Sequence, residues 1–221
     1  VHFAPNREAG KDILKVDGLS KSIDGVKILD NISFTINKGE KVVFLGKNDL
    51  AQTTLFQILN GELKPDSGTF TWGVTITHSY LPTDNSKFFN DGEHSLIDWL
   101  RQYSEDKHES FIRGFLGKML FSGEEALKKT NVLSGGEKVR CMLSKMMLSG
   151  ANALILDGPT NHLDLESITA VNDGLVRYKG TVLFSSHDHE FIQTVANRII
   201  VIDKTITHDA YSTFDEYLEV Q

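Results

Sequence analysis

The sequence has very little cysteine and no long apolar run. Its 221 residues include one cysteine, Cys141, so no disulfide can form within the chain, which is typical of proteins in a reducing cytosol. No apolar stretch approaches the roughly 18 to 20 residues that a membrane-spanning helix needs, and no basic-then-apolar leader stands at the front. We therefore expect a cytoplasmic protein with no membrane insertion, in which Cys141 is a small buried side chain.

Basic clusters are scarce as well. The longest basic run is the pair Lys128 and Lys129, and the formal net charge is -7 with a pI near 5.6. Because nucleic-acid phosphates are bound by clustered lysine and arginine, this balance makes the chain a poor stand-alone partner for nucleic acid. The histidines show no metal-ligand spacing, which favours surface or packing roles for all of them except His187.

The apolar content is sufficient for one large core. Hydrophobic residues make up 40% of the chain, which fits one domain with a smaller lobe better than two independent domains. The sequence begins "VHFAPNREAGKDIL" without a methionine, and this start is typical of a linker entering a domain. We predict a piece of a longer polypeptide, in which residues 1–12 end an inter-domain linker and residues 13–221 form the domain.

Apolar patterns predict alternating strands and helices. Strand patterns occur in "ILKVDGLS", "VKILDNISFTI", "EKVVFLG", "NALILD", "GTVLFSS" and "RIIVID", the last of which is predicted to be the final strand. After "EKVVFLG", a glycine-led loop leads into the helical pattern "TTLFQILN". Apolar stripes between residues 95 and 127, continued in "GGEKVRCMLSKMML", predict a helical lobe at about residues 86–148. The alternation predicts a doubly wound, mainly parallel α/β sheet.

The stretch "GKNDLAQTT", Gly46 to Thr54, partly matches a phosphate-binding loop. Such a loop reads G-x-x-x-x-G-K-[ST]: its glycines let backbone N–H groups approach a phosphate, its lysine reaches the outer oxygens and its hydroxyl binds magnesium. Gly46 and Thr53 match, but Ala51 and Gln52 stand where the second glycine and the lysine belong. Alone, the stretch does not separate a degenerate phosphate loop from a coincidence of turn residues.

Three further motifs follow in order: "LSGGE" at residues 133–137, "LILDGPTNHLD" at 154–164 and "SSHD" at 185–188. The ordered set resembles the nucleotide-binding domain of ATP-binding cassette (ABC) proteins. This resemblance covers essentially the whole chain and implies a P-loop NTPase-like α/β fold, with a mostly parallel core sheet, an antiparallel β edge and a helical signature lobe. The wording "PTNHLDLESI" and the ending "AYSTFDEYLEVQ" are most similar to the second, C-terminal cassette of the ABC-F subfamily, soluble two-cassette proteins of which many act on ribosomes.

The resemblance implies two sets of site residues. The chain's own nucleotide site consists of Gly46, Lys47, Asn48, Asp49, Leu50, Ala51, Gln52, Thr53, Thr54 and Asp157. Thr53 and Asp157 are the expected Mg²⁺ ligands, and His187 is the switch histidine of the γ-phosphate or, alternatively, a helix cap. The signature face, which completes the partner cassette's site, consists of Leu133, Ser134, Gly135, Gly136, Glu137 and Asp164. Backbone N–H groups at the start of its helix suit a γ-phosphate.

Several own-site positions depart from the family pattern. Gly158 stands where the family has a catalytic glutamate, and a positioned general base contributes about 10²- to 10⁴-fold. Gln52 removes a charge-assisted bond worth roughly 1.5 to 3 kcal/mol, and Asp49 adds a carboxylate beside a polyphosphate. Lys47 either replaces the missing lysine or is a solvated loop residue. We therefore expect the own site of this ATPase relative to be impaired in hydrolysis.

These residues predict an asymmetric switch. The chain lends its signature face to a hydrolytic site on the first cassette of the same polypeptide, while its own site holds ATP and Mg²⁺ without efficient turnover. By resemblance, the full protein is a cytosolic ATPase that contacts the ribosome through segments outside this chain, and the isolated piece is a monomer or weak dimer. Two alternatives stay open: the ATP-binding subunit of a membrane transporter, and an interaction module that binds no nucleotide. Because several motifs drift together, natural degeneration is favoured over engineering.

Overall fold

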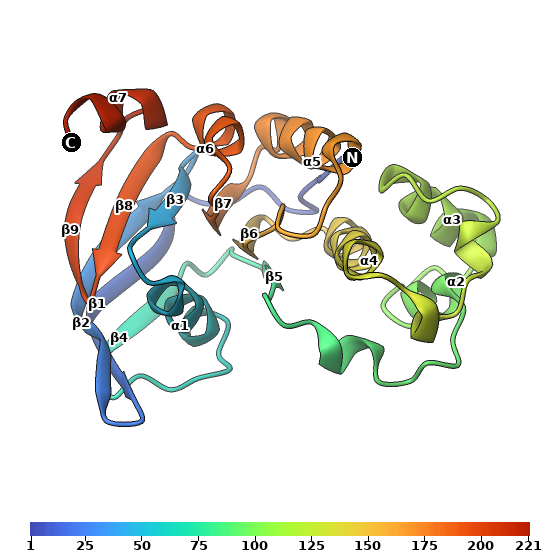
Figure 1. Ribbon diagram of the computed structural model, residues 1–221, viewed down its shortest axis with the longest axis horizontal. Helices are drawn as coiled ribbons and strands as arrows, with labels where there is room; N and C mark the ends of the chain where they lie inside the picture. The colour runs from blue at the N-terminus through green and yellow to red at the C-terminus, as the bar shows by residue number, and fades with distance from the viewer.

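The computed structural model describes residues 1–221 as two sheets with flanking helices (Figure 1). The strands are β1 (Asp12–Ile23), β2 (Val26–Asn37), β3 (Lys41–Leu45), β4 (Ser67–Trp72), β5 (His78–Leu81), β6 (Ala153–Asp157), β7 (Thr181–Ser185), β8 (Arg198–Asp203) and β9 (Thr205–Ala210). The α-helices are α1 (Asp49–Leu59), α2 (Leu96–Arg101), α3 (Glu109–Lys118), α4 (Gly135–Ser149), α5 (Leu165–Arg177), α6 (His189–Val195) and α7 (Phe214–Glu219).

The larger sheet is mostly parallel. Its six strands run in the order β5-β6-β7-β3-β8-β9, and a smaller antiparallel sheet has the order β2-β1-β4. Within the larger sheet only the β8–β9 pair is antiparallel. This confirms the predicted fold class, a parallel core sheet with an antiparallel edge.

The parallel strands are buried on both faces of the sheet. In β3, Val42 and Phe44 belong to the core shared with α1 and the smaller sheet, whereas Val43 belongs to the core shared with α5, α6 and the helical lobe. All residues of β6 are buried. Strands covered on both faces need continuous apolar runs, and such runs identify these strands in the sequence. The carboxyl ends of β3, β6 and β7 lie side by side, and the polar residues of the site follow them.

The helical lobe consists of α2, α3 and α4; α4 lies beside the larger sheet, and α2 and α3 lie on the far side of α4 (Figure 1). The lobe begins at the 3-10 turn Ser86–Phe89, close to the predicted boundary, and α4 ends at Ser149 with Gly150 as its C-cap. Trp99 is 1% exposed and stacks on Phe89 with their ring centroids 4.9 Å apart. The predicted helical spacing holds in α2 and α3, which are separated by a non-helical segment at residues 102–108.

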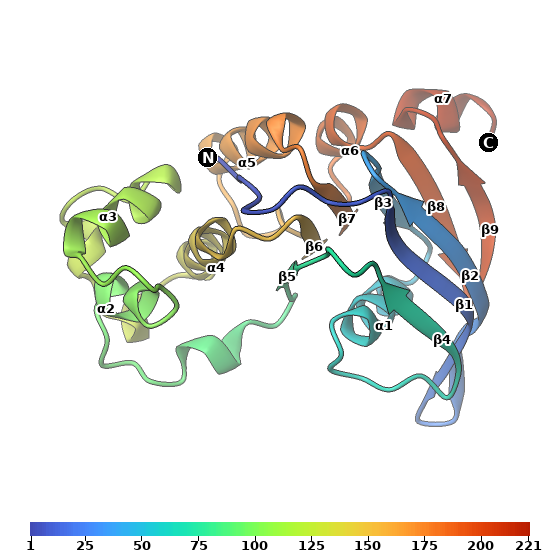
Figure 2. The same cartoon turned by 180° about the vertical axis from the view of Figure 1, so that it is seen from behind.

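The first eleven residues form no strand or helix, but they pack against the domain. Phe3 is 4% exposed and meets the ring of Tyr178 edge-on, with centroids 6.1 Å apart. The backbone N–H of Asn6 donates to the carbonyl of Gly150 at 2.8 Å. Figure 2 shows this segment running from the side of α5 to the start of β1. The assignment of residues 1–12 to a linker stays a prediction.

The C-terminal end differs from the expectation that "RIIVID" forms the last strand. A tight turn at Lys204, which has a φ of 70°, leads into β9, and Ile199 pairs with Ala210 across the new edge. The helix α7 then packs on α6. The prediction was wrong because β9 has only intermediate or exposed side chains, so it carries no apolar run that would mark a strand.

Candidate functional site

A small cavity lies where the carboxyl ends of β3, β6 and β7 meet the start of α1. We call it the β3–α1 cavity; its volume is about 140 Å³. It is lined by Phe44, Leu45, Gly46, Asp49, Gln52, Thr53, Thr83, Asp157, Gly158, Asn161, Ser185, Ser186 and His187. The structure therefore brings together residues from "GKNDLAQTT", from the end of "LILD" and from "SSHD", as the sequence predicts.

Two hydroxyl groups hold the carboxylate of Asp157 in this cavity. The Thr53 hydroxyl donates to one carboxylate oxygen at 2.6 Å, and the Ser185 hydroxyl donates to the other at 2.8 Å. Asp157 is 6% exposed. Ser185 also accepts a hydrogen bond from the backbone N–H of Gly158 at 3.0 Å. The sequence analysis assigns no role to Ser185, although its place at the end of a buried strand is a usable signal.

The expected glycine-led loop is mostly helix, and this corrects the sequence prediction. Helix α1 begins at Asp49 rather than at Thr53, with Asn48 as its N-cap. The Asn48 side chain accepts from the N–H of Leu50 at 2.9 Å, and its carbonyl accepts from the N–H of Ala51 at 3.1 Å. Both N–H groups are thus used inside the helix. Aspartate and alanine favour a capped helix start where two glycines would favour an open loop.

Gln52 and Thr54 are buried rather than presented to a ligand. Gln52 is 2% exposed, and its amide nitrogen packs so close to Gly46 that a Cβ there would lie 2.7 Å away. The amide oxygen of Gln52 and the hydroxyl of Thr54 have no hydrogen-bond partner. Lys47 is exposed and does not line the cavity, so its side chain does not take the place of the missing lysine.

A hydrogen-bonding contact between Asp49 and His187 lies at the rim of the cavity. The Nε2 atom of His187 lies 3.0 Å from each carboxylate oxygen of Asp49. The two side chains are 72% and 71% exposed, respectively. Capping of the following helix, the alternative role for His187, is instead carried by Asp188, which accepts from the N–H of Phe191 at 2.9 Å.

Gly158 occupies a backbone position that a glutamate does not fit. Its φ of 60° lies in the left-handed region, and a Cβ at this position would overlap the side-chain amide of Asn161. A residue with a Cβ costs about 1–2 kcal/mol in this conformation. A glutamate at position 158 would therefore be strained in this backbone conformation.

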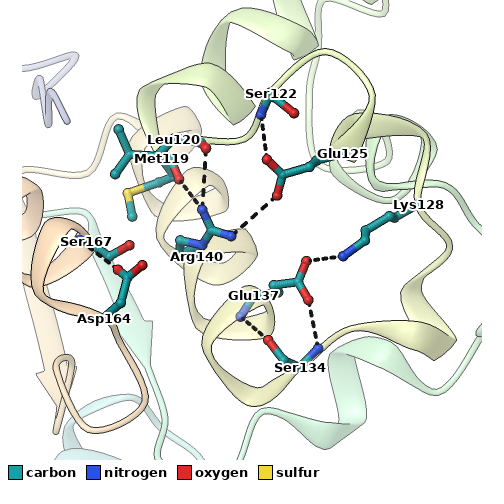
Figure 3. Close-up of polar contacts among 10 residues, drawn as sticks. All are labelled: Met119, Leu120, Ser122, Glu125, Lys128, Ser134, Glu137, Arg140, Asp164 and Ser167. Atoms are coloured by element: carbon teal, nitrogen blue, oxygen red, sulfur yellow. Dashed lines mark hydrogen bonds and ion pairs between the residues drawn. The ribbon is translucent and has the colours of Figure 1, made fainter.

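A second, shallower hollow surrounds the start of α4, with a volume of about 330 Å³. Ser134 is the N-cap of α4, and it forms a capping box with Glu137. Figure 3 shows this pair, with Lys128 reaching Glu137 at 2.8 Å and Asp164 facing the same hollow. We call it the Ser134 hollow; it is lined by Ser134, Gly135, Gly136, Glu137, Arg140, His162, Leu163, Asp164 and Ser167. Leu133 is 9% exposed and lies under this face as a core residue.

The turn before α5 packs directly on the start of α4. A Cβ on Gly136 would overlap the carbonyl of His162, whereas a Cβ on Gly135 would meet nothing closer than the His162 ring at 3.7 Å. Asp164 caps α5 by accepting from the N–H of Ser167 at 2.9 Å. Hydrogen bonds from Ser167 lower the pKa of the Asp164 carboxyl, and Arg140 adds an attraction of the same sign. Asp164 is thus an ionised cap beside the glycines.

Arg140 is a further residue of the Ser134 hollow that the sequence prediction did not single out. Its guanidinium donates to the carbonyls of Met119 and Leu120 at 3.3 and 3.4 Å and lies 3.7 Å from a carboxylate oxygen of Glu125 (Figure 3). It also lies 4.3 Å from the centroid of the Phe121 ring. Arg140 therefore ties the end of α3 to the hollow; its place in "KVR" after the motif was the available signal.

Protonation of Glu137 is expected to loosen the start of α4. Burial favours the neutral carboxyl, but hydrogen bonds from Lys128 and Ser134 outweigh it and lower the pKa of Glu137. A lowered pKa stabilises the fold above the unfolded-state value of about 4.3 and loses this effect as pH falls through the folded-state value. Amide-exchange protection of the first turn of α4 should therefore fall below about pH 4. A Glu137→Gln variant should lack this pH dependence; an identical profile in both proteins would contradict the assignment.

Comparison with known proteins identifies the family. A protein-family model described as ABC transporter matches residues 29–161, more than half of the 221-residue chain. The chain belongs to the ABC transporter family. Its α/β fold with a helical lobe is that of an ATP-binding cassette. A dimeric, post-hydrolysis cassette structure bound to ADP and Pi superposes on it with a TM-score of 0.77. The two sequences are 18% identical, and the superposition covers 90% of this chain and 98% of the other.

The cassette also has full-length relatives that are much longer than itself. It is 63% identical over 220 residues to the uncharacterized ABC transporter ATP-binding protein YkpA of Bacillus subtilis, covering 99% of the chain and 41% of the relative. It is 33% identical to the energy-dependent translational throttle protein EttA of Escherichia coli K12, covering 89% and 36%. The ABC transporter F family member 5 of Arabidopsis thaliana is 29% identical, covering 99% and 32%. The chain thus spans less than half of these relatives. None of its helices has the length and apolarity needed to cross a bilayer.

ABC ATPase domains bind ATP, generally with Mg²⁺, and the β3–α1 cavity fits this cofactor only in part. The paired oxygens of Thr53 and Asp157 are donors of the kind that Mg²⁺ prefers. The triphosphate is disfavoured, because Gln52 is neutral and buried and Asp49 is an acid at the rim. The Ser134 hollow, by contrast, keeps its glycines at a helix start. The two sites of this cassette therefore differ in what they can bind.

Proposed function

We propose that this chain is the second, C-terminal cassette of an ABC-F protein, and that its Ser134 hollow completes the ATP site of the first cassette. In this proposal residues 1–12 end the inter-domain linker, residues 13–221 form the cassette and residues 86–148 its helical lobe. The observation that carries it is the asymmetry between an intact Ser134 hollow and a β3–α1 cavity that lacks a phosphate-neutralising residue.

The geometry of the Ser134 hollow supports a role toward a phosphate on a partner. Gly135 and Gly136 begin a helix of 15 residues, whose N-terminal N–H groups and dipole favour an anion. Gly135 is free of close contacts on its Cβ side, so a ligand can approach its backbone. Asp164 lies at the same hollow as an ionised group, in the position that the family resemblance places across the cassette interface.

Hydrolysis is proposed to occur on the partner's residues, with ATP and Mg²⁺ as cofactors. Gly158 supplies no general base, and its backbone conformation disfavours a glutamate. His187 contacts Asp49, so a γ-phosphate would have to compete with this carboxylate for the imidazole. The chain's own contribution to catalysis is then the backbone N–H groups at the start of α4, which would stabilise charge on a phosphate held by the first cassette.

The names of two relatives support a role in translation. EttA is described as a translational throttle protein, and the Arabidopsis relative as a member of the F family. The formal net charge of -7 disfavours direct RNA binding by this chain, so the proposal places ribosome contacts in other segments of a cytoplasmic protein. The isolated chain is expected to be a monomer or weak dimer.

Co-sedimentation tests the partner. The longer protein, with ATP present, is expected to pellet with ribosomes through a sucrose cushion and to stay out of washed membranes. Because phosphate contacts are screened, the bound fraction should fall as salt rises from about 50 to 200 mM. Recovery in the membrane fraction and absence from ribosomes would instead support the ATP-binding subunit of a membrane transporter.

A further inference from the structure

The β3–α1 cavity contains no cationic side chain that could neutralise a polyphosphate. Its titratable lining residues are Asp49, Asp157 and His187, and no lysine or arginine is among them. Phosphate sites in proteins pair their ligand with charged donors such as lysine and arginine. Two carboxylates and one imidazole therefore disfavour an anionic ligand and favour pairing within the cavity.

The pairing that the structure shows involves the histidine. Because the Nε2 atom of His187 is 3.0 Å from both carboxylate oxygens of Asp49, the ring nitrogen is directed at this carboxylate. Asp49 is the first residue of α1, and His187 follows β7, so the pair joins two walls of the cavity. The exposure of both side chains places the pair at the rim, where an incoming ligand meets it first.

The space behind the pair is also small. Its volume of about 140 Å³ is below the roughly 300–1,000 Å³ of ordinary small-molecule sites. The amide of Gln52 packs against Gly46, which removes room beneath the helix start. A nucleoside triphosphate would therefore have to displace the Asp49 carboxylate and rebuild the start of α1 before it could enter.

We propose that Asp49 is a resident anionic ligand of His187, which occupies the histidine in place of a phosphate and keeps nucleoside triphosphates out of the β3–α1 cavity. This inference rests on the proposed function and specifies why the chain's own β3–α1 cavity does not bind nucleotide. The own cavity then stays in one state throughout the cycle, and only the site completed by the Ser134 hollow opens and closes on ATP. A pair of cassettes would bind one ATP rather than two.

Nucleotide binding by the 221-residue chain tests this proposal. Isothermal titration with a non-hydrolysable ATP analogue and Mg²⁺ is expected to give no saturable binding to the wild type. Asp49→Asn, which removes the charge but keeps the size, is expected to bind saturably, with an affinity about tenfold or more above the weakest that the titration detects. Asp49→Gly, which also favours an open loop, should gain at least as much. Failure of both folded variants to bind more tightly than the wild type would overturn the proposal, as would tight binding by the wild type.

The structure offers a matched control in a second exposed histidine–aspartate pair. His189 lies 2.8 Å from Asp215 on the α6–α7 side of the domain, outside the cavity. Asp215→Asn changes the net charge by the same amount, so it should bind nucleotide as the wild type does. A gain in Asp215→Asn equal to that in Asp49→Asn would show a general charge effect and contradict a resident ligand.

A second set of measurements distinguishes an effect of the Asp49–His187 contact from an effect of the Asp49 charge alone. His187→Ala removes the histidine but leaves the Asp49 carboxylate, so it should not gain affinity. The imidazole resonances of His187 should shift on Asp49→Asn without nucleotide, because the contact exists in the free chain; unchanged resonances would contradict it. These measurements need no partner cassette. The Asp49–His187 proposal can therefore be contradicted while the Ser134 hollow still supports ATP turnover in the longer protein. Equally, loss of support for the Ser134 hollow would leave the Asp49–His187 proposal standing.

Discussion

Replacement of Gly135 by aspartate in the longer protein is expected to lower its ATP turnover by about 100-fold or more, the range seen when one preorganised donor to a developing charge is lost. The substitution places a carboxylate at the first turn of α4, where the proposed γ-phosphate of the partner's ATP would lie. The fold should tolerate it, because a Cβ at Gly135 meets nothing closer than 3.7 Å and an acid favours a helix start. Steady-state phosphate release measures the effect.

A matched substitution controls for the new charge. Gly117 lies in α3, and a Cβ there meets nothing within 4 Å, so Gly117→Asp adds the same side chain to a helix away from the hollow. Its turnover should stay within about threefold of the wild type, a shift that corresponds to well under 1.4 kcal/mol. Circular dichroism should show both variants folded. Turnover that survives in Gly135→Asp would contradict the proposal that this chain completes the partner's site.

Replacement of Arg198 by methionine is expected to lower the free energy of unfolding by about 3–5 kcal/mol, the cost of leaving the buried carboxylate of Glu40 without its charged partner. Arg198 is 5% exposed; it donates to Glu40 at 2.7 Å, to both oxygens of Asp209 at 2.8 Å and to the carbonyl of Thr35. Glu40 is 7% exposed and also accepts from the Tyr211 hydroxyl. The network joins β2, β8 and β9 to Glu40, the residue directly before β3, so its loss affects both sheets.

Urea unfolding at neutral pH measures this loss. Arg113→Met supplies the same chemical change in a more exposed pair: Arg113 lies 3.5 Å from Glu109 with side-chain exposures of 35% and 56%, and its other bond is to the carbonyl of Gly123. Exposed pairs contribute about 0–1 kcal/mol, so this variant should remain close to the wild type. Equal losses in the two variants would show that the buried network is not what stabilises the sheet.

The parts of the fold that the sequence predicts are those whose burial leaves a pattern. Val42 to Phe44 and Leu154 to Leu156 are buried on both faces, and continuous apolar runs reveal such strands. The strand β9 lies at an edge with mixed side chains, and its "TITHDA" has no run to detect. Helix α1 starts early because Asn48 caps it, and the motif comparison concealed this cap by aligning Asp49 with a loop glycine.

In the candidate sites, too, some features are predicted by sequence motifs and others depend on the three-dimensional structure. Residues joined by sequence motifs, such as Thr53 with Asp157, were expected to meet, and the structure brings them within hydrogen-bond distance. The Asp49–His187 contact links residues 138 positions apart and depends on where α1 begins. The left-handed backbone at Gly158 depends on the local path of the turn with Asn161. Neither spacing nor composition encodes these features, so they emerged only with the three-dimensional arrangement.

The packing of Phe3 against Tyr178 determines where a recombinant fragment of this domain should begin. A recombinant fragment that starts at β1 would lose this aromatic contact and the bond from Asn6 to Gly150. It would leave the ring of Tyr178, the C-cap of α5, less covered, which favours self-association of the shortened protein. The first residue of an expression fragment should therefore precede Phe3, even though nothing before Asp12 forms a strand or helix.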